Sequence, residues 1–177
     1  MGKALFMHRL ILFRHAKTEA RPAGREDIDR VLVERGRNEA ALMGRVLAQA
    51  GFEPDLVLVS SAARARETWE YAKAPFPNAV VETREGLYNA TPEEVEAELG
   101  DTDHSAGVVM VVGHNPSLQE LAINLLIDGG APPSDVEKVS AGFPTATAAV
   151  FSIDPMGRAA LEGLFHARDY RSQEGEG

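Results

Sequence analysis

The sequence contains no cysteine, no long apolar run and no excess of basic residues. The absence of cysteine excludes disulfides and thiolate metal sites. Lysine and arginine number 18 against 27 aspartates and glutamates, which gives a net charge of -9. A general nucleic-acid binder needs clustered basic side chains, so we expect no nucleic-acid partner. No stretch reaches the roughly 20 apolar residues that cross a bilayer, so we expect no membrane association.

The size and the apolar content of the chain predict one domain. Its 177 residues and hydrophobic fraction of 44% suffice for a single sizeable core. We expect one domain over residues 1–177, with a polar tail that frays from about residue 168. Residues 1–13 lack the long apolar core and the small-residue cleavage site of a secretory signal. Together with the absence of cysteine, this predicts a cytoplasmic protein.

Short apolar runs alternate with helical patterns along the chain. Strands are expected at 10–13, 55–59, 79–82, 107–112 and 146–153, with a hairpin partner or edge strand at 159–165. Helices are expected at 34–50, around 64–71, at 91–99 and at 117–127. This alternation predicts an α/β fold with three layers, α/β/α, around a mostly parallel sheet that has an antiparallel edge strand.

Local signals refine the ends of these elements. Thr91, Pro92 and Glu94 form a capping-box pattern that predicts a helix start. Either Ser60 or Ser61 is expected to cap the helix that follows them. Glycine and proline in the segment 129–142 predict a surface connection there.

Polar side chains follow three of the expected strands. Arg14 and His15 end the first strand, and Gly113 and His114 end the fourth. Arg64 lies just inside the helix that follows the second strand. Ligands of open α/β sheets bind at the carboxyl ends of the strands. If the strands are parallel, these two histidines and two arginines meet at one edge of the sheet.

Two histidines and two arginines without cysteine fit the chemistry of phosphoryl transfer. Guanidinium groups hold phosphoryl oxygens in bidentate contacts and neutralise their charge. A neutral imidazole can attack phosphorus and carry the group covalently, and neighbouring cations favour the neutral form. A second histidine can donate to the phosphoryl oxygens. The same residues also fit simple anion binding, so residue types alone predict a phosphate site and leave turnover open.

Three motifs in this order resemble the histidine phosphatase superfamily, which includes the phosphoglycerate mutases. Residues 13–18 (FRHAKT) are similar to its Arg-His-Gly motif, with alanine in place of the glycine. Residues 60–68 (SSAARARET) resemble its second-arginine motif, and residues 112–115 (VGHN) resemble its second-histidine strand end. The alanine, the short chain and residues 29–36 (DRVLVERG) resemble the SixA-like phosphohistidine phosphatase branch.

The resemblance implies a role for each matching residue and no metal or cofactor. His15 would be the phosphorylated nucleophile. The phosphate pocket would include Arg14, Arg64 and His114, with Lys17 and Thr18 beside them. Glu85 is the nearest match to the glutamate that serves some members as general acid.

The expected reaction is removal of phosphate from a phosphohistidine on a protein partner, because a short chain leaves the pocket open to a protein side chain. A phosphatase of a small phosphate ester is the second hypothesis, and an acid at Glu85 would favour it. A third is a phospho-binding module without turnover. A metallohydrolase is disfavoured, since the expected pocket lacks carboxylates to accompany histidine.

Overall fold

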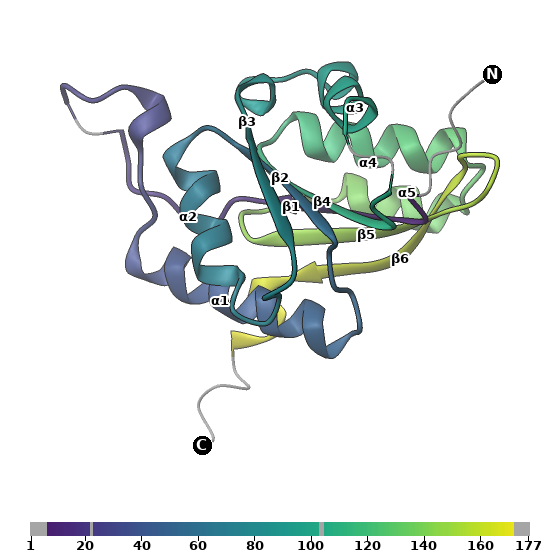
Figure 1. Ribbon diagram of the computed structural model, residues 1–177, viewed down its shortest axis with the longest axis horizontal. Coiled ribbons are helices and arrows are strands. Elements are labelled where there is room, and N and C mark those ends of the chain that lie inside the picture. Colours follow the sequence, from purple (N-terminus) through teal and green to yellow (C-terminus); the bar gives the residue numbers. More distant parts are fainter. Residues whose placement is uncertain (1–6, 22, 103–104, 172–177) are drawn as a thin grey trace.

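The computed structural model describes residues 7–21, 23–102 and 105–171 of the chain. Its strands are β1 (Arg9–Arg14), β2 (Leu56–Ser60), β3 (Val80–Arg84), β4 (Val108–Gly113), β5 (Thr147–Ile153) and β6 (Ala159–His166). They form a six-stranded sheet of order β3-β2-β4-β1-β5-β6, which runs through the centre of the molecule (Figure 1). The sheet is mixed, and most of its strands share one direction.

Strand direction agrees with the expected architecture. β1, β2, β3 and β4 are paired in parallel, whereas β5 is antiparallel to its two neighbours, β1 and β6. The predicted α/β fold with a mostly parallel sheet and an antiparallel edge is therefore confirmed. The reversed strand is β5, and β6 pairs with it as the outermost strand.

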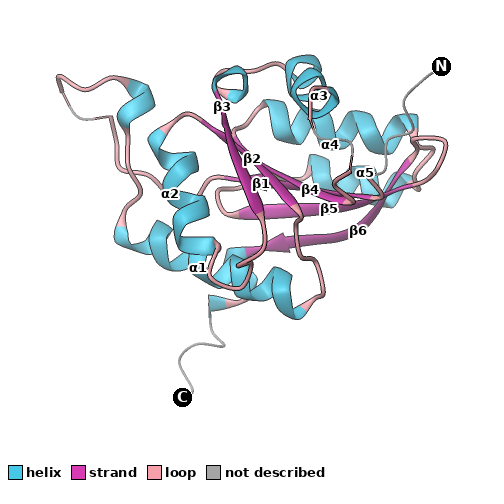
Figure 2. Cartoon of the chain, viewed as in Figure 1, coloured by secondary structure: helices cyan, strands magenta, loops and turns pink. Residues whose placement is uncertain are grey.

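Helices cover both faces of this sheet (Figure 2). The α-helices are α1 (Glu34–Gln49), α2 (Ala63–Ala72), α3 (Pro92–Gly100), α4 (Ser117–Asp128) and α5 (Pro133–Ser140). Short 3-10 turns are η1 (Asp27–Asp29), η2 (Glu85–Leu87) and η3 (Ala167–Asp169). α1 and α2 pack on one face, and α3, α4 and α5 supply buried side chains to the other.

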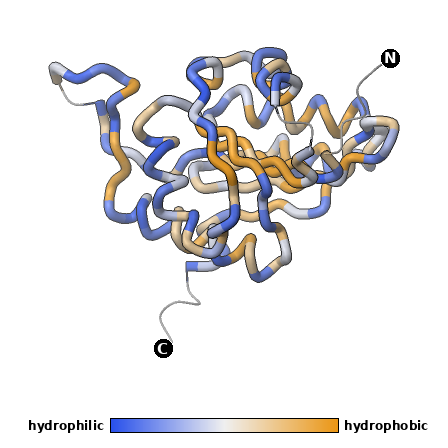
Figure 3. The backbone as a smooth tube through the Cα atoms, in the orientation of Figure 1, coloured by the Kyte–Doolittle hydropathy of each residue, from blue (hydrophilic) through white to orange (hydrophobic). Residues whose placement is uncertain are grey.

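Burial on both faces explains the unbroken apolar runs of the central strands. Side chains of a strand alternate between the two faces, so Ile11 and Phe13 join one core cluster while Leu10 and Leu12 join the other. A strand that is covered on both faces has no solvated side and reads as continuously hydrophobic. Figure 3 shows the central strands as the most hydrophobic part of the chain.

The pairing of β1 with β4 sets the position of the two motif histidines. Arg14 is the register partner of Gly113, so both strands end at the same level of the sheet. The backbone nitrogen of His15 donates to the carbonyl oxygen of Gly113 at 3.0 Å. His15 and His114 therefore leave neighbouring strands at adjacent points of one edge.

Two local predictions have opposite outcomes. The capping box of α3 is present, because Thr91 accepts from the backbone of Glu94 and the Glu94 carboxylate accepts from the backbone of Thr91. The predicted serine cap of α2 is wrong: the N-cap is Ala62, without a side-chain cap. The hydroxyl of Ser60 bonds to His114 instead, so the serine serves the site and not the helix.

The segment 129–142 is not the plain surface connection that its glycines and prolines suggested. It contains α5, which begins after Pro132 and buries Val139 in the core cluster beside α4. The expected tail also starts with structure, since Arg168 lies in η3 and Arg171 forms an ion pair with Glu39 at 3.4 Å. The remainder of that tail lies outside the described residues.

A search of the described ranges found no helix that combines the length and the apolar character needed to cross a membrane.

Candidate active site

His15 lies at the centre of the site with one ring nitrogen fixed. Its Nδ1 lies 2.8 Å from the carbonyl oxygen of Ala16. A carbonyl can only accept, so Nδ1 carries the proton and the neutral ring has its lone pair on Nε2. Burial lowers the pKa of His15 from 6.5 to about 3, and the nearby charges of Arg64 and Arg14 add to this decrease. His15 is therefore a neutral imidazole near pH 7, with its free electron pair at Nε2.

Arg14 is held at the end of β1 by a carbonyl from a distant loop. Its Nη1 donates to the carbonyl oxygen of Phe143 at 2.8 Å. The side-chain amide of Asn115 donates to the same oxygen at 2.9 Å. Phe143 lies in the loop that precedes β5, so this loop forms one wall of the site. These contacts orient the guanidinium beside His15.

Arg64 reaches the site from the first turn of α2, and Asp27 of η1 holds it there. Its Nη1 donates to the backbone oxygen of Asp27 at 2.9 Å, and its Nη2 donates to the Asp27 carboxylate at 3.2 Å. The Tyr88 hydroxyl donates to the same carboxylate oxygen at 2.8 Å. This bond, aided by the charges of Arg64 and Arg30, lowers the pKa of the Asp27 carboxyl. Asp27 is thus a carboxylate that anchors the second arginine.

His114 faces His15 across the site, with a distance of 5.3 Å between ring centroids. Its Nε2 shares a hydrogen bond of 2.7 Å with the Ser60 hydroxyl, which also accepts from the backbone of Ala62 at 3.4 Å. Burial and the charge of Arg64 lower the pKa of His114 to about 4. A neutral ring that accepts from Ser60 at Nε2 keeps its proton on Nδ1. In that tautomer Nδ1 is a hydrogen-bond donor.

Several buried polar atoms here lack a hydrogen-bond partner among the described residues. They are Arg14 Nε, Arg30 Nε, Arg64 Nε, His114 Nδ1 and Asn115 Oδ1. A buried donor left unpaired costs roughly 1–3 kcal/mol. Three of these atoms belong to the two arginines and the histidine whose charges act on His15. A phosphoryl group has several oxygens and would supply the acceptors that they lack.

The structure brings together four of the predicted site residues: Arg14, His15, Arg64 and His114. Glu85 begins η2 with an exposed side chain that makes no hydrogen bond or ion pair with the described residues. Tyr88, in the same loop, reaches the site in its place, with its ring 5.8 Å from that of His114.

Lys17 and Thr18 lie in the loop after β1. The Lys17 side chain is exposed, and Thr18 pairs with Leu32 in an isolated bridge. No described contact joins either side chain to His15. Phosphate contacts from these two residues remain a prediction.

Sequence reasoning missed Asp27 and Tyr88 and misassigned Ser60. Asp27 and Tyr88 are 61 residues apart, and neither belongs to a strand-end motif. Their role in holding Arg64 is visible only in the three-dimensional structure, where Asp27 bonds to Arg64 and Tyr88 bonds to Asp27. For Ser60, the signal was present, since it ends β2 at the same edge where His114 follows β4.

No group of three or more histidine, aspartate or glutamate side chains in the described ranges is placed to hold a metal ion. Most of the charged side chains at the site are instead arginines.

Comparison with known proteins adds independent evidence. Residues 10–106 match the model of the histidine phosphatase superfamily (branch 1). An uncharacterized protein of Mycobacterium tuberculosis is 38% identical over 140 residues, which are 79% of this chain and 86% of the relative.

Two solved structures superpose closely on this fold. A candidate phosphohistidine phosphatase SixA from Agrobacterium tumefaciens has a TM-score of 0.80 at 29% identity, with 90% of this chain and 98% of that chain covered. A second candidate SixA, from Nakamurella multipartitia, has a TM-score of 0.78 at 30% identity, with 90% and 95% covered. Motifs, site geometry, family model and superposition agree, and the chain belongs to the histidine phosphatase superfamily, in its SixA-like branch.

Proposed function

We propose that this protein is a metal-independent phosphatase that carries the phosphoryl group on Nε2 of His15, and that its substrate is a phosphohistidine on a protein partner. The observation that carries the proposal is the set of unpaired buried donors around a neutral His15. Arg14 Nε, Arg64 Nε and His114 Nδ1 match the needs of a group with several anionic oxygens. Membership of the superfamily supports phosphatase activity in general.

The reaction is a double displacement. Nε2 of His15 donates its electron pair to phosphorus, and the bond from phosphorus to the substrate nitrogen breaks. The electrons of the broken bond stay with the leaving imidazole, which departs neutral with a proton on its other ring nitrogen. Water then attacks phosphorus, the bond to Nε2 breaks, and inorganic phosphate leaves with His15 restored. The two arginines and His114 stabilise the charge that grows on the phosphoryl oxygens in both steps.

The placement of Glu85 favours a nitrogen leaving group over an alkoxide. An alkoxide leaving group needs a proton from a positioned acid, and Glu85 is exposed without a contact to the site. Imidazole leaves more easily, so phosphohistidine cleavage makes a smaller demand on such an acid. The names of the two SixA-like structures point to the same substrate class.

The decisive experiment is detection of the covalent intermediate. The enzyme is mixed with a phosphohistidine-bearing peptide, quenched in alkali, and analysed by mass spectrometry for a phosphoryl group on His15. His15→Gln should abolish both the adduct and turnover, whereas His8→Gln, an exposed histidine at the opposite end of β1, should retain both. Binding of phosphate without any adduct on His15 would leave a phospho-binding module.

A substrate panel with chelator present throughout separates the remaining alternatives. We expect turnover of phosphohistidine to exceed that of small phosphate esters, and Glu85→Gln to leave phosphohistidine turnover within about twofold. Preferred turnover of an ester that is lost in Glu85→Gln would assign Glu85 as the acid of an ester phosphatase. Activity that the chelator abolishes would contradict metal independence.

A further inference from the structure

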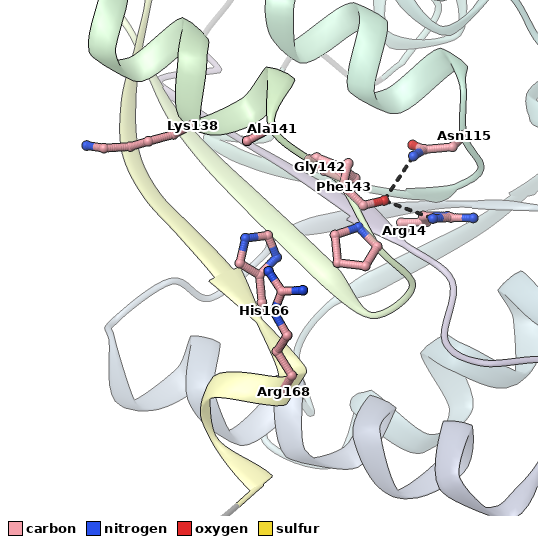
Figure 4. Close-up of a pocket in the computed structure, with 9 residues that line it drawn as sticks. Arg14, Asn115, Lys138, Ala141, Gly142, Phe143, His166 and Arg168 are labelled. Atoms are coloured by element: carbon pink, nitrogen blue, oxygen red, sulfur yellow. Dashed lines mark hydrogen bonds between the residues drawn. The ribbon is translucent and has the colours of Figure 1, made fainter.

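An open cleft of about 390 Å³ lies directly beside the site. It is lined by the end of β1, the turn before α4, α5 with the loop that follows it, the end of β6 and η3. The lining side chains include Arg14, Asn115, Lys138, Phe143, His166 and Arg168. Figure 4 shows Arg14 and Asn115 at one side of this cleft, with His166 and Arg168 together at the other. We call this feature the basic cleft.

The basic cleft concentrates positive charge in a chain whose net charge is -9. Arg14, Lys138 and Arg168 line it, and the lining contains no acidic residue. A smaller hollow of about 130 Å³ shares Arg168 and His166 with it and adds further basic residues. An acidic protein repels anionic ligands at long range, so a local cluster of cations gives an approaching anion one favoured position.

Glu39, the acidic residue that lines the smaller hollow, does not neutralise the positive charge there. Glu39 is buried and forms ion pairs with Arg35 at 2.9 Å and with Arg171 at 3.4 Å. Two arginines therefore surround one carboxylate, and the hollow remains positive.

Arg168 is the cation of the cleft that is available to a ligand. It is exposed and makes no hydrogen bond or ion pair with the described residues. Lys138, in contrast, already pairs with Asp135 at 3.3 Å. Beside Arg168, His166 shares a hydrogen bond of 2.9 Å with Thr147, which holds the ring in the wall of the cleft.

The basic cleft and the catalytic centre are continuous. Arg14 lines the cleft and directly precedes His15, and its bond to Phe143 makes the loop before β5 a shared wall. A phosphoryl group seated at His15 and Arg14 would leave the adjoining part of its substrate at the mouth of the cleft. The cleft is therefore placed to contact residues that neighbour the phosphorylated residue of the substrate.

We propose that the basic cleft binds an acidic side chain of the protein segment that carries the phosphohistidine, with Arg168 as its main charge partner. This inference rests on the proposed function, because it assumes a protein substrate. It assigns a specificity residue outside the segment 10–106 that matches the family model.

Phosphohistidine peptides of matched sequence provide the test. A single glutamate is moved one residue at a time on either side of the phosphohistidine, and each peptide is compared with its glutamine counterpart by kcat/KM. At the favoured position we expect glutamate to be preferred by roughly twofold to fivefold, the upper range of one exposed charge pair. The preference should shrink as salt is added, because exposed pairs are screened.

Charge reversal then identifies the partner. Arg168→Glu should lose the preference for glutamate and gain one for lysine at the same position. Arg158→Glu makes the same change of net charge at the turn between β5 and β6, which lies at the opposite edge of the sheet, and should keep the preference of the wild-type protein.

Three outcomes would overturn the inference, and they are distinguishable. Equal turnover of all peptides would remove the role of the cleft while the proposed function stands. An Arg168-dependent preference for a small ester that carries a carboxylate, without one among the peptides, would assign the cleft to small anions. Failure to turn over any phosphohistidine peptide would overturn the proposed function and this inference with it.

Discussion

The hydroxyl of Thr68 joins the loop of His15 to the helix of Arg64. Its Oγ1 accepts from the backbone nitrogen of Ala16 at 3.0 Å and donates to the carbonyl oxygen of Arg64 at 2.7 Å. Thr68 is fully buried, so no water is available to replace either bond. One side chain therefore fixes the spacing between Ala16, which follows the proposed nucleophile His15, and Arg64, which is proposed to hold the phosphoryl group.

Thr68→Val should disturb this spacing. It removes the hydroxyl and leaves the amide of Ala16 unpaired, which costs roughly 1–3 kcal/mol of stability. We expect kcat to fall by about tenfold, because misplacement of the nucleophile weakens its alignment. Steady-state kinetics and urea unfolding check both effects, and Thr68→Ser, which retains the hydroxyl, is the control. A valine variant with the wild-type kcat would contradict the role assigned to Thr68.

Ser60→Ala should release the ring of His114. Without the serine hydroxyl, nothing among the contacts of Nε2 favours a proton on Nδ1. We expect kcat/KM to fall by roughly tenfold and the tautomer of His114 to become mixed in nitrogen NMR spectra. Ser61→Ala removes the neighbouring hydroxyl and should change neither. An unchanged tautomer in Ser60→Ala would show that Ser60 does not set it.

Arg64→Ala should remove a large part of the catalytic power. Loss of one preorganised charge donor costs roughly 3–4 kcal/mol of transition-state stabilisation, so kcat should fall by about 100-fold to 1,000-fold. Arg64→Lys should recover little, since lysine lacks the planar fork of donors. Arg66→Ala is the matched control in the same helix, because Arg66 is exposed. If Arg64→Ala and Arg66→Ala had equal rates, the pocket would be wrongly placed.

The lowered pKa values of the two site histidines predict a loss of stability in acid. Folded His15 and His114 have pKa values of about 3 and about 4, against 6.5 as the ordinary value. As the pH falls below 6.5, the unfolded chain takes up protons that the folded chain does not, so the free energy of unfolding decreases. Each imidazole contributes up to about 1.4 kcal/mol per pH unit, until the pH reaches its folded pKa.

Urea unfolding at several pH values measures this dependence. His15→Gln should lose less stability than the wild-type protein between about pH 7 and pH 5, whereas His8→Gln should follow the wild-type curve. Parallel curves for wild type and His15→Gln would show that His15 is not held neutral by the fold.

Gly36→Ala should destabilise the loop that carries His15. A Cβ at Gly36 of α1 would collide with the backbone carbonyl group of Lys17. The strain should exceed the gain of roughly 1 kcal/mol in helix propensity, for a net loss of about 1–2 kcal/mol in urea unfolding. Gly100→Ala is the control, because a Cβ at that helical position meets nothing within 4 Å. A Gly36→Ala variant that is more stable than the wild-type protein would show that the loop around Lys17 moves aside at little cost in free energy.

The sequence predicted the parts of the fold that follow from local pattern. Apolar runs that stop at a histidine marked β1 and β4, and the capping box marked the start of α3. It failed for α5, because that helix has eight residues and buries only Val139 among them. A segment of eight residues with so few apolar side chains shows no clear helical periodicity, so the sequence did not distinguish it from a loop.

Some residues of the candidate site could likewise be predicted from local sequence, and others could not. Arg14, His15 and His114 lie at or directly after strand ends, so the sequence predicted that they meet if the strands are parallel. The pairing of β1 with β4, which places them side by side, came from the structure. Glu85 and Tyr88 share one loop, and only the course of η2 decides which of the two side chains turns inward. Contacts of that kind depend on packing between distant segments, which a single sequence does not record.

The reversed direction of β5 has a consequence for how such a site is built. A forward strand next to β1 would deliver its preceding loop to the amino-terminal edge of the sheet, far from the chemistry. Because β5 is reversed, the loop before β5 and the residues after β6 both lie at the carboxyl-terminal edge of the parallel strands, next to the site. The pairing of Thr147 with His166 shows this. The wall formed by residues 141–168 thus comes from a later stretch of the chain than Arg14, His15, Arg64 and His114, so mutation can reshape the wall while those four side chains stay intact.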